Sequence, residues 1–87
     1  MASDRVPRIR ECLEKAFSPV TLEVIDDSHR HAGHAGAKDG RGHFRVRIVS
    51  ERFAGTKPLE RHRMVYAALG RMMETDIHAV SVVAETP

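Results

Sequence analysis

The sequence predicts an α/β domain of the α+β type, in which two helices cover one face of a three-stranded mixed sheet. Two hydrophobic periods indicate this arrangement. Residues 43–50 alternate apolar and polar side chains, as a half-buried strand does, and from residue 57 the apolar side chains recur at helical spacing. Gly55 lies between the two patterns, where glycine permits a sharp reversal of the chain. Strand, turn and long helix therefore form the centre of the predicted fold.

Two further elements precede this centre. Residues 4–17 carry apolar side chains at helical spacing with charged side chains largely opposite, so they form an amphipathic helix. Ser18 and Pro19 end this helix, because the residue before a proline disfavours helical backbone angles. Residues 20–26 follow as a strand with apolar and polar faces.

The central helix is expected to begin near Lys57, with Thr56 as its N-cap, and to run as one helix to Met73. Gly70 lies within the pattern at a modest cost in helix propensity. We interpret His62 as a structural histidine, because it lies within the apolar arc. That arc is expected to face the core and contains Leu59, His62, Val65, Tyr66, Leu69, Met72 and Met73.

The last strand and the connections complete the topology. Residues 77–84 form this strand, on which Val80 and Val82 share a face with His78. The first two strands pair antiparallel, whereas the helix before the third strand suits a right-handed crossover to a parallel neighbour. The whole chain, residues 1–87, is assigned to a single domain.

Composition narrows the classes of protein. The formal net charge is only +2, from 14 basic and 12 acidic side chains that form no block of one sign. The single cysteine, Cys12, excludes an internal disulfide and indicates a reducing compartment. No apolar run approaches the ~20 residues of a membrane span, and the N-terminus lacks the apolar region of a signal peptide. We therefore expect a cytoplasmic protein with no membrane partner.

Histidine is the unusual residue type, with six in 87 residues. His29, His31, His34 and His43 lie in or beside a glycine-rich segment, residues 27–42, that reads as a long loop between the first two strands. Neutral imidazole is a common ligand of zinc, copper and iron, although a solvated polar loop explains the same residues. Because parallel strands begin at the same end of a sheet, His43, His78 and the returning loop could meet there.

Catalytic motifs give no support for an enzyme. Ser28 and Ser50 have no Ser-His-Asp context, and no glycine loop of the phosphate-cradling kind is present.

Four segments resemble the BolA family, and together they cover essentially the whole chain. They are LEVIDDSHRHAGH, HFRVRIVSERFAG, PLERHRMVYAAL and IHAVSVVAETP. The resemblance implies a class II KH-like fold with the order helix, strand, strand, helix, strand, and no enzymatic activity. It also implies a partner, a monothiol glutaredoxin with a CGFS active site, with which such proteins form a heterodimer that shares a [2Fe-2S] cluster.

The resemblance also implies which residues hold the cluster. The family uses a histidine at the start of the last strand, which matches His78, and a histidine or cysteine in the loop, which matches His34. His43 is an alternative loop ligand, while His29 and His31 match no ligand position. A glutaredoxin cysteine and a glutathione thiol complete the site, so we expect no cluster in the isolated protein, which is then a monomer or weak homodimer. The implied role is iron-sulfur trafficking or iron and redox sensing.

A second function also follows from the resemblance. Some BolA-like proteins are transcriptional regulators, with roles in the stress response, and arginines at surface positions could meet DNA phosphates. The candidates are Arg45, Arg47, Arg61 and Arg63. An ordinary charged surface, balanced by the acidic residues, explains the same pattern.

Overall fold

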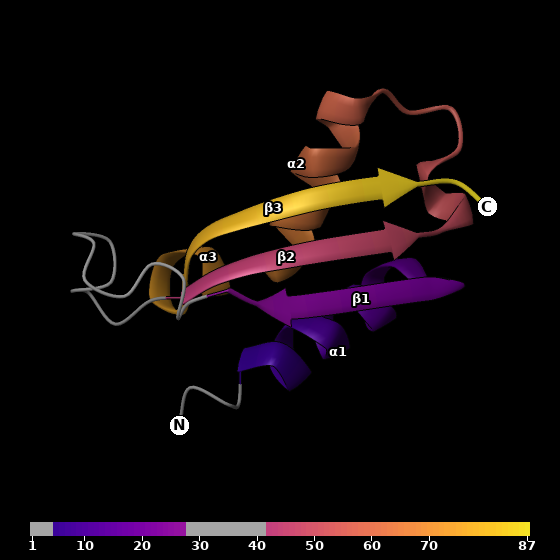
Figure 1. Ribbon diagram of the computed structural model, residues 1–87. Helices are drawn as coiled ribbons and strands as arrows, with labels where there is room; N and C mark the ends of the chain where they lie inside the picture. Colours follow the sequence, from indigo (N-terminus) through magenta and orange to yellow (C-terminus); the bar gives the residue numbers. More distant parts are fainter. Residues whose placement is uncertain (1–4, 28–41) are drawn as a thin grey trace.

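The helices and strands follow the predicted order, and the predicted fold class is confirmed (Figure 1). The computed structural model describes residues 5–27 and 42–87. Residues 28–41, with His29, His31 and His34, lie outside these ranges, so the loop prediction falls mostly beyond the described part. The elements are α1 (Arg5–Phe17), β1 (Thr21–Asp26), β2 (Gly42–Val49), the short 3-10 helix η4 (Glu51–Phe53), α2 (Pro58–Leu69), α3 (Met72–Thr75) and β3 (Ile77–Glu85).

The sheet has the mixed topology that the crossover argument predicts. Its strand order is β1-β2-β3, with β1 antiparallel and β3 parallel to the central strand β2. Val24, Val46 and Val82 lie side by side across the three strands. The helices cover one face of the sheet and leave the other uncovered, as Figure 1 shows. We call the uncovered side the open face.

Alternation along the strands decides which side chains enter the core. On β2, Phe44, Val46 and Ile48 are buried, whereas Arg45 and Arg47 are exposed on the open face. Burial of each large apolar side chain stabilises the fold by about 1.5–3 kcal/mol. The helix layer and the 3-10 helix cover this side of the sheet with Ile9, Leu13, Phe17, Phe53, Val65, Leu69 and Met72.

The prediction of one long helix was wrong. The helix ends at Gly70, which adopts a φ of 55° while its N–H donates to the carbonyl of Tyr66. Glycine accepts a positive φ at little cost, so this residue stops α2 and a separate short helix, α3, follows. The N-cap is Lys57 and not Thr56, whose hydroxyl donates instead to the carbonyl of Phe53 at 2.6 Å. No described helix is long and apolar enough to cross a bilayer.

The predicted buried arc of α2 was also partly wrong. Val65 and Leu69 are buried, and Met64 and Ala68 pack beside them. Leu59, in contrast, is 61% exposed, and Tyr66 is 40% exposed. Figure 1 shows the first turn of α2 projecting past β3, the edge strand, so this turn has no sheet beneath it.

Asp76 joins α1 to the start of β3. Its carboxylate accepts a hydrogen bond from Nη1 of Arg8 at 3.0 Å, pairs with Arg5 at 3.5 Å, and accepts from the hydroxyl of Thr75 at 2.6 Å. The Thr75 hydrogen bond, helped by Arg8 and Arg5, lowers the pKa of the Asp76 carboxyl, against a smaller effect of burial. The carbonyl of Asp76 accepts from the N–H of Gly42 at 2.9 Å, which holds the starts of β2 and β3 together.

The two halves of the predicted arc respond differently to truncation. Leu69→Ala leaves a cavity in the core and lowers the free energy of unfolding by about 3 kcal/mol. Leu59→Ala removes an exposed side chain and changes it by less than about 0.5 kcal/mol. Urea unfolding of both variants measures the difference. Equal losses would contradict the packing described for α2.

Asp76→Asn is expected to lower stability by about 1 kcal/mol near neutral pH, since it removes one charge of an ion-pair network at the surface. Because the pKa is lowered from 3.8, the charged carboxylate stabilises the fold above that pH, and the benefit is lost as pH falls through the lowered folded value. The difference in free energy of unfolding between wild type and variant should therefore fall toward zero at acidic pH. Glu74→Gln is the matched control for loss of one negative charge. A difference that does not change with pH would contradict the role given to Asp76.

Candidate metal site at one end of the sheet

Two histidines meet where the parallel strands begin. The rings of His43, from β2, and His78, from β3, have centroids 5.0 Å apart and planes inclined by 46°. Neighbouring parallel strands start at the same end of a sheet, which is why residues 35 positions apart in the chain come together. The expected meeting of His43 and His78 is therefore found, while their role as ligands stays a prediction.

A β-bulge sets the position of His78. Gly42 pairs with Ile77 but His43 pairs with Ala79, so His78 is the extra residue between two paired positions. Ile77 is fully buried and His78 is exposed, whereas Val82 is buried, so the prediction that His78 shares a face with Val80 and Val82 was wrong. Strict alternation fails at a bulge, and here the irregularity turns the imidazole away from the core.

The surroundings of His43 are more enclosed. Its side chain is half-buried and its Nε2 atom is buried. Asp27, which is buried, donates its N–H to the carbonyl of His43 at 2.8 Å, and its carboxylate pairs with Nε of Arg45 at 2.6 Å. His43 also lines a small hollow with Ala79 and Ser81. The backbone beside His43 is thus held at a fixed position, while His78 is the more accessible imidazole.

The placement of His34 is outside the described residues. The described residues stop at Asp27 before it and begin again at Gly42, next to His43. In the described residues, no group of three or more His, Cys, Asp or Glu side chains is arranged to hold a metal ion. His43 and His78 offer two nitrogen donors at most, so a metal bound here would take its other ligands from residues 28–41 or from another molecule.

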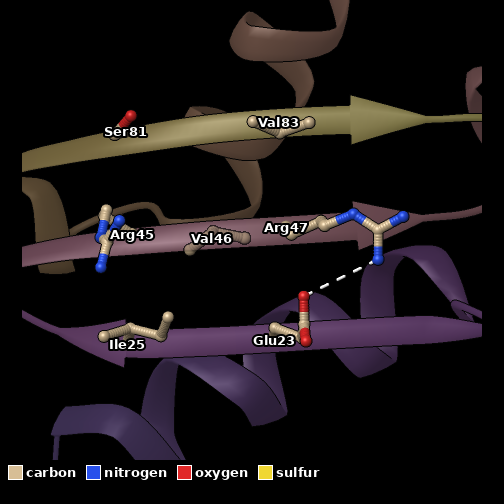
Figure 2. A pocket seen from close by; sticks show the side chains of 7 residues that line it. All are labelled: Glu23, Ile25, Arg45, Val46, Arg47, Ser81 and Val83. Atoms are coloured by element: carbon tan, nitrogen blue, oxygen red, sulfur yellow. Dashed lines mark ion pairs between the residues drawn. The ribbon is translucent and has the colours of Figure 1, made fainter.

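The four arginines proposed for DNA do not form one surface. Arg45 and Arg47 lie on the open face, whereas Arg61 and Arg63 belong to α2 in the helix layer. Figure 2 shows Arg47 paired with Glu23 across the strands, at 3.7 Å, and Arg47 also pairs with Glu85 at 3.2 Å.

Arg61 has partners within the chain. It donates from Nε to the carbonyl and hydroxyl oxygens of Thr56, both at 3.2 Å, and from Nη1 to the carbonyl of Ala84 at 3.0 Å. Arg63, two positions later on α2, is exposed. Contact with nucleic acid stays a prediction for all four arginines. Of the two arginines on α2, Arg63 is the more accessible.

Sequence reasoning missed the pairing of Asp27 with Arg45 and the hollow on the open face. Figure 2 shows that hollow between Ile25 of β1 and Val83 of β3, with the arginines of β2 between them. Ile25 is 47% and Val83 51% exposed. The alternation of each strand predicts which face a side chain takes, but only the register shows which side chains become neighbours.

Comparison with known proteins decides the family. The model of the family described as BolA-like protein matches residues 13–87. The chain belongs to the BolA family. Among solved structures, the BolA domain of SufE1 from Arabidopsis thaliana superposes with a TM-score of 0.85 and 47% identity, over 95% of this chain and 92% of that one. The α-β-β-α-β arrangement described above is therefore the fold of BolA domains.

Two curated relatives have similar identity. Protein BOLA1, chloroplastic, of Arabidopsis thaliana is 46% identical over 87 residues, which is 97% of this chain and 54% of the relative. The DNA-binding transcriptional regulator BolA of Escherichia coli (strain K12) is 47% identical over 75 residues, 86% of this chain and 69% of the relative. The chain thus spans about half the length of BOLA1, and it spans 23% of the plant SufE-like protein 1, which it also matches.

Proposed function

We propose that this BolA-family domain is a non-enzymatic adaptor that shares a [2Fe-2S] cluster with a monothiol glutaredoxin, in iron-sulfur trafficking or in iron and redox sensing. The observation that carries the proposal is the exposed imidazole of His78, which lies at the start of two parallel strands beside the ring of His43. Imidazole pairs ligate one iron of [2Fe-2S] centres of the Rieske type, so nitrogen donors suit this cluster without a second cysteine.

His78 and His34 are the proposed ligands. His78 is exposed at the end of the sheet, so a cluster carried by another protein can approach its ring. His34 is the second ligand because it matches the family's loop position. A cysteine of the glutaredoxin and a glutathione thiol supply the two sulfur donors, and the bound cluster supplies a one-electron redox centre.

His43 has a different part in this proposal. Its Nε2 atom is buried, so that atom can reach a cluster outside the domain only after the ring turns. In the described conformation, His43 packs against the His78 ring and limits the directions that this ring can take. We therefore assign His43 to positioning His78, with direct ligation by His43 as the alternative.

Reconstitution of the heterodimer with substituted histidines tests these roles. His78→Ala is expected to abolish the visible absorbance and circular dichroism of the cluster, and His34→Ala to weaken or alter them. His43→Ala should shift the spectrum and keep the cluster, because it removes a neighbour and not a ligand. His29→Ala and His31→Ala are the matched controls and should leave the spectrum nearly unchanged.

Because an imidazole must lose its proton before it binds iron, cluster assembly should also weaken in acid. A wild-type spectrum from His78→Ala would contradict the assignment. Loss of the spectrum in His31→Ala, with His34→Ala unaffected, would show that another loop histidine is the ligand.

The alternative is a DNA-binding regulator, and the name of the Escherichia coli relative favours it. On the open face, Arg45 and Arg47 are accompanied by Asp27, Glu23 and Glu85, so the nearby carboxylates outnumber the arginines. Phosphate binding there requires these ion pairs to break, which makes the helix layer with Arg63 the better candidate surface.

A gel shift at several salt concentrations tests this alternative. If the domain binds DNA through the helix layer, Arg63→Ala weakens binding. It also lowers the number of counterions released on binding by about one, which is measured from the salt dependence of the binding constant. Arg45→Ala is the comparison variant on the opposite face and should have little effect. Binding that is insensitive to Arg63→Ala and falls with Arg45→Ala would place DNA on the open face instead.

A further inference from the structure

Each edge strand of the sheet has one carbonyl bound by an arginine from the helix layer. Arg10 of α1 donates from Nη1 to the carbonyl of Leu22 on β1 at 3.1 Å. Arg61 of α2 donates from Nη1 to the carbonyl of Ala84 on β3 at 3.0 Å. Edge strands present unpaired N–H and C=O groups that can pair with another chain, so their protection has consequences for association.

The direction of the Ala84 carbonyl can be inferred from the hydrogen bond of the next residue, Glu85. Ser50 donates its N–H to the carbonyl of Glu85 at 2.9 Å, so the Glu85 carbonyl is directed toward β2. Carbonyls of successive residues in a strand point to opposite sides in the plane of the sheet. The carbonyl of Ala84 is therefore directed to the outer edge, and Val82 and Val80 present their backbone groups to the same side.

We propose that Arg61 protects the outer edge of β3 from pairing with the same edge of a second copy of this chain, because its guanidinium occupies the carbonyl of Ala84. No strand in the described parts of the chain pairs with this edge. The inference is independent of the cluster proposal, since it needs neither a metal nor a glutaredoxin.

The sequence of β3 is self-complementary in the antiparallel direction. Two copies arranged about a twofold axis at Ser81 place Val80 opposite Val82 and Ala79 opposite Val83. β-branched and small side chains then face one another, and no like charges are opposed. In this register the backbone of Ala84 is opposite His78 of the second copy, so the ladder needs the carbonyl that Arg61 holds.

Arg61 is well suited to block this edge because its guanidinium is fixed at two points. Its Nε atom is held by Thr56, at the turn before α2, while Nη1 reaches across to β3. Arg61 belongs to α2, whose first turn projects past β3 (Figure 1). A second chain must displace this side chain before it can extend the ladder over Ala84.

Sedimentation equilibrium of the full chain tests the proposal. Wild type is expected to remain at 9.7 kDa, the mass of one chain, as concentration rises. Arg61→Ala and Arg61→Gln should shift toward twice that mass. Arg63→Ala, which removes an exposed arginine two positions along the same helix, is the control and should behave as wild type.

A second substitution identifies the surface. Ser81→Asp added to Arg61→Ala places two carboxylates opposite each other at the twofold axis and should return the protein to a single chain. Association that persists in this double variant would overturn the proposal, because it would not involve antiparallel β3. Folded, monomeric Arg61 variants would also overturn it. So would unfolding of both variants by circular dichroism, which would assign Arg61 to stability alone.

Discussion

The parallel pairing of β2 with β3 is the constraint on which the rest of the structure depends. It requires a crossover, and that crossover is α2 and α3, which cover the core side of the sheet. It also brings the beginnings of both strands to one end, where Gly42 is bonded to Asp76 and His43 lies against His78. An antiparallel β3 of similar length would put His78 at the opposite end from His43. The candidate site is therefore a consequence of strand direction.

Much of this arrangement could be predicted from the sequence, because the two hydrophobic periods differ clearly. The alternation around Phe44 and the helical spacing around Val65 place the central elements, and the crossover rule then fixes the direction of β3. Three features could not be predicted in the same way. The backbone of Gly70 can continue a helix or end it, the register at His78 contains a bulge, and the burial of Leu59 depends on where the sheet ends.

The partners of the charged residues could not be predicted from the sequence either. Their number is read directly from the sequence, whereas their partners depend on register and on the helix layer. Arg45 and Arg47 lie beside carboxylates on the open face, and Arg61 is bonded to two main-chain carbonyls. Arginines that look alike in the sequence therefore have different roles in the structure. Some hold the fold together, and others, such as Arg63, remain exposed.

The central proposal is that this chain shares a [2Fe-2S] cluster with a glutaredoxin and binds it through imidazole nitrogens. Pulsed electron paramagnetic resonance of the reduced heterodimer tests it most directly, with ¹⁵N-labelled histidine in this chain only and an unlabelled glutaredoxin. The account predicts hyperfine couplings from two histidine nitrogens that change with the label, and loss of one of them in His34→Ala. A cluster spectrum without coupling to the labelled histidines would contradict the account.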